Sequence, residues 1–101
     1  MVNGFTVITL CGSTKFKEDF IRVSEELCLS GNIVISLELF GHADGKVITP
    51  EIKEMLDRAH RAKIDMSDAI YVINKGGYIG ESTKGEIEYA KEKGKRIIYM
   101  E

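Results

Sequence analysis

The sequence predicts an α/β fold, a three-layer sandwich in which a four-stranded parallel sheet carries helices on both faces. Short segments rich in β-branched and apolar residues alternate with longer segments in which apolar residues recur every three or four positions, a pattern typical of strand–helix–strand units. Glycines and a single proline stand at boundaries between these segments. Because parallel strands require right-handed crossovers, we expect the strand order 2-1-3-4 within one domain, residues 1–101.

The first half of the chain contains two predicted strands and one helix. Residues 5–11 are mostly apolar and partly β-branched, as in a strand that is buried on both faces. A helix is expected from about residue 15 to residue 30, where Gly31 ends it. Residues 32–37 form the second expected strand. The helix presents one apolar stripe: Phe16, Phe20, Val23 and Leu27.

The second half begins with the longest expected irregular connection, residues 38–48. Thr49 is a predicted N-cap, and Pro50 at the first helical position is a strong start signal for a helix to about residue 63. The residues expected to be buried on this helix share one face: Ile52, Met55, Leu56 and Ala59. The remaining elements follow in order: a strand at 69–73, a helix at 83–93 ended by Gly94, and a strand at 96–100.

Composition and charge exclude several classes of protein. Hydrophobic residues make up 44% of the chain and charged residues 30%, as in ordinary globular domains. The net charge of −2 gives no reason to expect a nucleic-acid polymer or an acidic membrane surface as partner. No apolar run approaches the roughly 20 residues that span a bilayer, and the N-terminus does not resemble a signal peptide. We therefore expect a cytoplasmic protein.

The two cysteines are expected to be small buried hydrophobes and not a disulfide. Cys11 ends an apolar strand, and Cys28 lies on the expected apolar face of a helix. No pair of histidines or cysteines has the spacing of metal ligands along the chain, so no metal site is expected.

Ligands of open parallel sheets bind beyond the carboxyl ends of the strands, where the strand order reverses. Here that crevice is expected between the first and third strands, and a glycine-containing loop follows each of them. In the first loop, Gly12 permits a tight turn, and Ser13 or Thr14 can cap the following helix while leaving N–H groups for an anion. A plain helix start is the alternative. The loop matches neither the phosphate-binding P-loop nor the dinucleotide glycine fingerprint, so ATP hydrolysis and NAD binding are not expected.

The second loop, residues 76–82, leads into a helix with carboxylates and hydroxyls near its start. Thr83 and Glu86 have the spacing of a capping box, which alone explains both residues. Alternatively, Glu86 projects into the crevice, where nearby N–H dipoles keep it ionised and ready to attack an electrophilic carbon. His60 suits proton transfer near neutrality, although a lone helical histidine is more often simply buried; His42 is a weaker candidate.

Three motifs together resemble a known family: Leu10-Cys11-Gly12-Ser13, Asp65-Met66-Ser67-Asp68-Ala69-Ile70, and Gly80-Glu81-Ser82-Thr83-Lys84-Gly85-Glu86-Ile87-Glu88-Tyr89-Ala90 with Gly94-Lys95. The chain resembles the nucleoside 2-deoxyribosyltransferase family, which includes deoxynucleoside 5′-monophosphate N-glycosidases. The likeness spans most of the chain. Its strongest element is the pattern Thr-x-x-Glu-Ile-x-Tyr-Ala-x-x-x-Gly-Lys.

The resemblance implies a flavodoxin-like, Rossmann-like core and a glutamate, matching Glu86, that attacks the anomeric carbon of a deoxyribosyl group. Displacement of the base gives a glycosyl-enzyme that water or a second base resolves, as in retaining glycosyl transfer. By position, Ser82 and Thr83 match the loop that holds a 5′-phosphate, and Ser13 lines the facing wall. No metal or organic cofactor is implied. Family analogy also suggests a homodimer or larger homo-oligomer.

Three positions depart from the family. His60 stands where these enzymes have an aspartate that holds the sugar and base. Gly80 stands where some transferases carry an acidic residue, with Glu81 one place away, and Leu10 stands where some carry a tyrosine. An imidazolium at His60 could protonate a leaving base nitrogen, provided that burial does not lower its pKa too far.

The preferred interpretation is an enzyme that cleaves or transfers the N-glycosidic bond of a nucleoside or nucleoside 5′-monophosphate. Glu86 is the expected nucleophile and His60 or Glu81 its acid–base partner. The expected substrate-binding residues are Gly12, Ser13, Thr14, Phe16, Gly80, Ser82 and Thr83. One alternative, favoured by the departures, is a catalytically inactive nucleotide-binding or regulatory module. Another is a structural subunit in which Thr83 and Glu86 only cap a helix.

Overall fold

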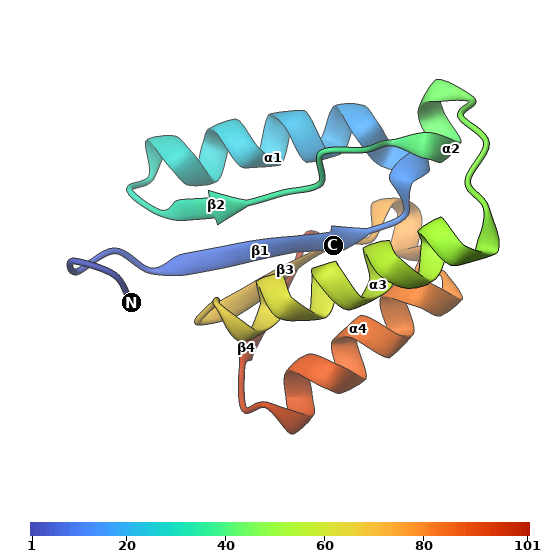
Figure 1. Ribbon diagram of the computed structural model, residues 1–101. Helices are drawn as coiled ribbons and strands as arrows, with labels where there is room; N and C mark the ends of the chain where they lie inside the picture. Colours follow the sequence, from blue (N-terminus) through green and yellow to red (C-terminus); the bar gives the residue numbers. More distant parts are fainter.

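The computed structural model describes the backbone of residues 1–101 and every side chain except those of residues 42 and 43, so the hypothesis about His42 lies outside the described residues. Four parallel strands form one sheet in the order β2-β1-β3-β4, which confirms the predicted strand order (Figure 1). The strands are β1 (Val7–Gly12), β2 (Ile33–Ile35), β3 (Ala69–Ile73) and β4 (Arg96–Tyr99).

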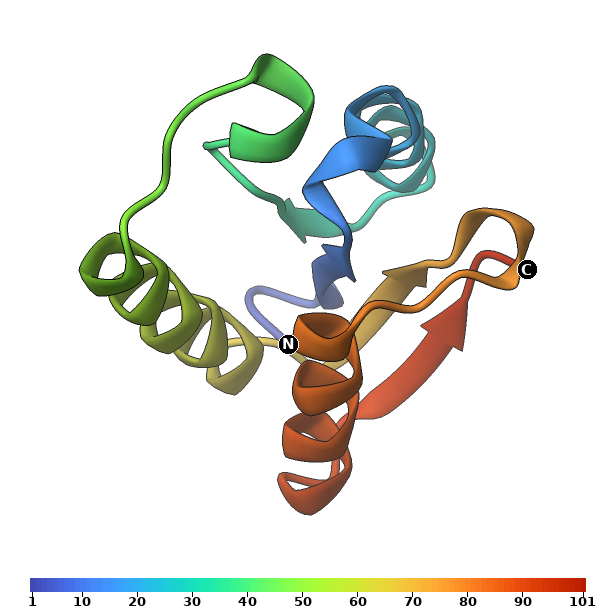
Figure 2. The same cartoon turned by 90° about the vertical axis from the view of Figure 1, so that its right-hand side faces the viewer.

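Helices cover both faces of this sheet, as the sequence predicts. Helix α1 lies on one face, and α3 and α4 lie on the other (Figure 2). The helices are α1 (Lys17–Leu29), α2 (Gly41–Asp44), α3 (Pro50–Asp65) and α4 (Glu81–Glu92), with short 3-10 turns at Thr14–Phe16 and Lys75–Gly77. None of the helices in the described part of the chain has the length and apolar character that crossing a membrane requires.

The core has two layers because successive side chains of a strand point to opposite faces of the sheet. On β1, Leu10 packs in the layer under α1, whereas Cys11 packs in the layer under α3 and α4. The α1 layer contains Leu10, Phe20, Val23, Phe40 and Ile73. The other layer contains Cys11, Ile64, Ile70, Val72, Ile87 and Ala90. Cys11 therefore faces the same side of the sheet as the side chains of α3 and α4.

Two predictions about buried helix faces are wrong. On α3, Ile52, Met55 and Ala59 are exposed, and the buried residues are His60 and Ile64 near its C-terminal end. The reason is that the N-terminal half of α3 borders a cavity, lined in part by Leu56 and Ala59, and does not pack on the sheet.

The prediction that Cys28 is buried is also wrong, since Cys28 is exposed on α1. The stripe that packs on the sheet runs through Phe20, Val23 and the half-buried Leu27. One residue further along a helix turns the side chain by about 100°, which carries Cys28 away from the sheet.

Candidate active site

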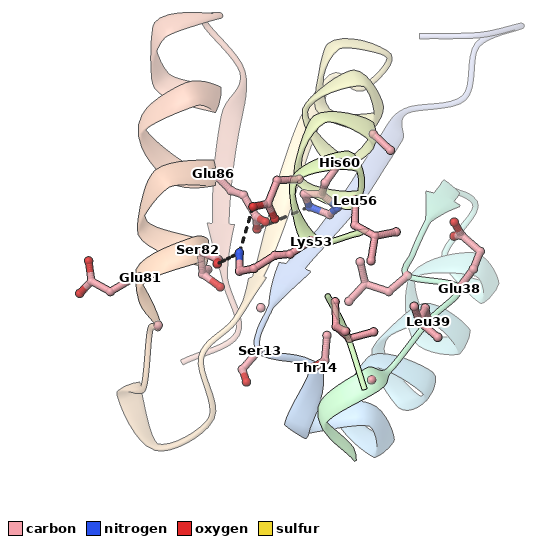
Figure 3. A pocket seen from close by; sticks show the side chains of 18 of the residues that line it. Ser13, Thr14, Glu38, Leu39, Lys53, Leu56, His60, Glu81, Ser82 and Glu86 are labelled. Atoms are coloured by element: carbon pink, nitrogen blue, oxygen red, sulfur yellow. Dashed lines mark hydrogen bonds and ion pairs between the residues drawn. The ribbon is translucent and has the colours of Figure 1, made fainter. Parts of the chain in front are cut away.

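A cavity of about 580 Å³ opens at the carboxyl ends of the strands, where the sequence places the crevice. Gly12, Ser13 and Thr14 line one wall, and the start of α4 lines the facing wall (Figure 3). α3 and the connection after β2 complete the enclosure. The volume falls within the range of about 300–1,000 Å³ that is usual for small-molecule sites.

Nine of the ten predicted site residues line this cavity: Gly12, Ser13, Thr14, His60, Gly80, Glu81, Ser82, Thr83 and Glu86. Phe16 is the exception. Its ring packs edge-on against Tyr78, with 6.0 Å between ring centroids, and against the core under α1. Tyr78 itself lines the cavity, so Phe16 supports the wall instead of forming it.

Three side chains from three different elements meet at the cavity: His60 and Glu86 line it, and Cys11 lies buried behind them. His60 Nε2 lies 3.5 Å from Glu86 Oε1 and 3.3 Å from Cys11 Sγ. Each position follows from local structure. Cys11 faces the α3 and α4 layer, His60 is four residues before the buried Ile64 on α3, and Glu86 is four residues before the buried Ala90 on α4.

The capping-box interpretation of Thr83 and Glu86 is wrong. α4 begins at Glu81, two residues earlier than predicted, with Gly80 as an N-cap that makes no side-chain cap bond. Thr83 is therefore the third helical residue, and it is buried. Glu86 belongs to the second turn, and its Oε1 has no hydrogen-bond partner among the described residues. The Glu86 side chain is thus not folded back onto the helix start.

The expectation that N–H dipoles keep Glu86 ionised is also wrong. Only the first turn of a helix has free N–H groups, and Glu86 lies beyond it. Burial instead raises the pKa of Glu86 to about 7, because the charged form loses its hydration. Near neutral pH the carboxyl group is therefore about half ionised.

The two groups that meet Glu86, the His60 imidazole and the Cys11 thiol, are neutral at the same pH. Burial, helped by the charge of Lys63, lowers the pKa of His60 to about 4. Burial and the nearby Glu86 carboxylate raise the pKa of the Cys11 thiol well above its usual value. The pre-formed imidazolium considered for His60 is therefore not the resting state of this side chain.

The structure does not bring the Glu81 side chain to Glu86. The Glu81 side chain is 93% exposed, pairs with Lys84 at 3.2 Å and points away from the cavity in Figure 3. The geometry gives no support to Glu81 as an acid–base partner, because the first residue of α4 projects outward while Glu86 faces α3.

Lys53 is a cavity residue that the sequence analysis missed. Its Nζ donates to Ser82 Oγ at 3.1 Å and to Asp57 Oδ2 at 2.9 Å, which links α3 to the start of α4 (Figure 3). The signal was available in the spacing of Lys53, Asp57 and His60, which places all three on one helical face.

Comparisons with protein-family models, with curated proteins and with solved structures find no match for this chain. The fold and the cavity define only a broad class of protein: an α/β protein with a cavity of small-molecule size at the carboxyl edge of a parallel sheet. Chemically, this cavity offers a carboxyl group that is half ionised near neutrality, a neutral imidazole and thiol beside it, and a lysine with free helix N–H groups nearby.

Proposed function

We propose that this protein is an enzyme that cleaves or transfers the N-glycosidic bond of a nucleoside or nucleoside 5′-monophosphate. The observation that carries the proposal is Glu86, whose buried and unpartnered Oε1 lies at a cavity of small-molecule size. The resemblance of the Thr83–Ala90 motif to nucleoside 2-deoxyribosyltransferases supports this assignment and suggests the sugar carbon as the electrophile.

The ionised Glu86 attacks the anomeric carbon, and the electron pair of the C–N bond leaves with the base. An ester-linked glycosyl-enzyme results, and attack by water or a second base at the same carbon releases the carboxylate. Because Glu86 Oε1 accepts no hydrogen bond from the described residues, its lone pairs are available for this attack. A carboxylate with a pKa of about 7 is also a stronger nucleophile than an ordinary glutamate.

His60 assists by exchanging a proton with Glu86 across 3.5 Å. At neutral pH half of the molecules carry a proton on Glu86, and His60 Nε2 can accept it as the substrate enters. This transfer is uphill by about three pKa units, about 4 kcal/mol, so imidazolium is a minor species. A proton on His60 is then next to the leaving base, whose nitrogen gains negative charge as the bond breaks.

The start of α4 and Lys53 form the proposed site for a phosphate or sugar hydroxyl. The first N–H groups of a helix lack intrahelical partners and favour an anion. Ser82 Oγ and the Nζ of Lys53 lie together at this point. Ser13 and Thr14 face it from the opposite wall of the cavity.

Incubation with a panel of ribo- and deoxyribonucleosides and their 5′-monophosphates, followed by chromatography for free base, tests the proposal. The wild type should release base, and Glu86→Gln should keep the fold and bind the same nucleotides without turnover. Unchanged turnover in Glu86→Gln would remove the nucleophile, and base release by neither protein would remove the activity.

A nucleotide-binding or regulatory module without catalysis is the second candidate. The neutral, buried His60 and the outward-pointing Glu81 favour it, because both leave the nucleophile without a pre-formed acid. This candidate predicts that nucleotides raise the melting temperature of the wild type while no free base appears on prolonged incubation.

We also propose that the protein is cytoplasmic and that it forms a homodimer or a larger homo-oligomer. The strands at the two ends of the sheet, β2 and β4, present unpaired edges, and edge strands are surfaces at which copies of a chain can pair. Sedimentation of the purified chain distinguishes a homodimer or larger assembly from a monomer.

A further inference from the structure

The cluster of Cys11, His60 and Glu86 has a property that glycosidic chemistry does not require. One thiol sulfur, one imidazole nitrogen and one carboxylate oxygen lie within 4.8 Å of one another. These three atoms come from β1, α3 and α4, so the tertiary fold assembles them. His60 Nδ1 and Glu86 Oε1 are both buried without a hydrogen-bond partner among the described residues.

We propose that these three side chains bind a Zn²⁺-like divalent cation, with the fourth coordination position open to the cavity. Three protein ligands of the Cys, His and carboxylate types, plus one exchangeable position, are the usual composition of zinc sites that are open to water or substrate. The open position faces the cavity that Glu86 and His60 line.

Two of the three distances between the ligand atoms fit a tetrahedral ion, and the third is within 4.8 Å. Zinc lies about 2.3 Å from sulfur and about 2.0–2.1 Å from nitrogen or oxygen, so tetrahedral ligand atoms are roughly 3.3–3.6 Å apart. The Cys11 Sγ to His60 Nε2 distance is 3.3 Å, and the His60 Nε2 to Glu86 Oε1 distance is 3.5 Å.

The charges also balance. A thiolate, a carboxylate and a neutral imidazole cancel the two positive charges of the ion, so a buried site gains no net charge. The thiolate selects Zn²⁺ and Co²⁺ against Mg²⁺ and Ca²⁺, which prefer oxygen ligands. The ion would also satisfy the buried Glu86 Oε1. His60 Nδ1, however, would carry an N–H without an acceptor, and the missing outer-shell bond keeps the affinity below that of a fully supported site.

Binding should release protons, because metal ligands must be deprotonated. At pH 7, Cys11 gives up its thiol proton and Glu86 gives up about half a proton, since its pKa is about 7. His60 is already neutral at this pH. The charged side chains that face the cluster come from α3 and from the segment after β2: Lys53, Asp57, Arg61, Lys63 and Glu38. Affinity should therefore increase with pH.

The bound ion and the proposed sugar chemistry compete for the same carboxylate. With its lone pair on the metal, Glu86 cannot attack a sugar carbon, so the metal-loaded protein should be inactive as a glycosidase. The site itself does not depend on that activity, and binding can be measured with no substrate present.

Titration of the reduced, metal-free protein with Co²⁺ tests the site through the thiolate-to-cobalt charge-transfer absorption. The wild type should show this absorption, lose it on addition of Zn²⁺ and keep it on addition of Mg²⁺. Cys11→Ala should abolish it, and His60→Gln and Glu86→Gln should each weaken binding by more than about 100-fold, since losing even an outer-shell partner costs about 10- to 100-fold. Cys28→Ala is the matched control, because Cys28 is an exposed thiol, and it should behave as the wild type.

Circular dichroism of each variant checks its fold. If Cys11→Ala does not fold, His60→Gln and Glu86→Gln decide the question with both thiols present. An absorption that Cys28→Ala removes, or equal Co²⁺ affinity in the wild type and these two variants, overturns the proposal. Metal binding without any base release would instead retain the site and remove only the proposed glycosidase activity.

Discussion

Glu86→Gln should make the protein more stable at alkaline pH, and the gain should disappear in acid. Folding raises the pKa of Glu86 from 4.5 to about 7, so the folded state holds a proton there that the unfolded state releases. Between these two values, stability due to Glu86 falls as the pH rises, because the folded state binds more protons. A difference of about 2.5 units corresponds to about 3 kcal/mol above pH 7.

His60 opposes this trend in the wild type. Folding lowers its pKa from 6.5 to about 4, so its contribution to stability increases with pH between these values, by a similar amount. The two effects nearly cancel between about pH 4.5 and 6.5. Glutamine resembles the protonated carboxyl group, so Glu86→Gln removes one effect and leaves the other.

Urea unfolding of the two proteins from pH 4 to pH 8 measures the difference directly. The free energies of unfolding should agree near pH 4, and the variant should be more stable by about 3 kcal/mol at pH 8. Glu88→Gln is the matched control, because its exposed side chain lies on the same helix. A Glu86→Gln variant that is no more stable than the wild type at pH 8 would refute burial as the cause of the raised pKa.

Three further outcomes follow from the same structure. For base release, kcat/KM should fall as the pH rises above about 7, because the Glu86–His60 pair then loses the proton that His60 delivers to the leaving base; a profile that rises through pH 7 and stays level would contradict proton delivery through this pair. Lys53→Met should raise KM for nucleoside 5′-monophosphates by about tenfold and leave KM for nucleosides unchanged, with Lys91→Met as the control; equal effects on both substrate classes would argue against phosphate binding at this point. Thr49→Ala should lower the free energy of unfolding by about 0.5–2 kcal/mol in urea titrations, because Thr49 Oγ1 accepts from Ile52 N–H at 3.2 Å, and an unchanged midpoint would exclude this cap as a stabilising contact.

Several elements were predictable because their signals are local. The pairing of Thr49 with Pro50 marks the start of α3, and the structure has that helix begin at Pro50 with Thr49 as its cap. The start of α4 was misjudged because Thr83 and Glu86 match a capping box in sequence, although the backbone turns at Gly80. A side chain can satisfy a local pattern in sequence while the tertiary structure assigns it another position.

The nine cavity residues were predictable for a topological reason. Both loops follow strands of one parallel sheet, and the carboxyl ends of such strands meet at a single edge. Lys53 was missed although its spacing from Asp57 and His60 places the three on one helical face, and Cys11 was missed because its place at the end of an apolar strand predicted only a buried hydrophobe.

The order of apolar and polar residues along this chain was sufficient to determine the alternation of strands and helices, the order of the strands and the edge at which a ligand would sit. The protonation of Glu86 and His60, and the meeting of both with Cys11, were decided only by the tertiary structure. Desolvation depends on everything that packs around a group, and the three side chains are separated by 49 and 26 positions of sequence, counted from their residue numbers. Packing of α3 and α4 on one face of β1 brings them within 4.8 Å of one another and removes the water that would otherwise keep the carboxylate acidic.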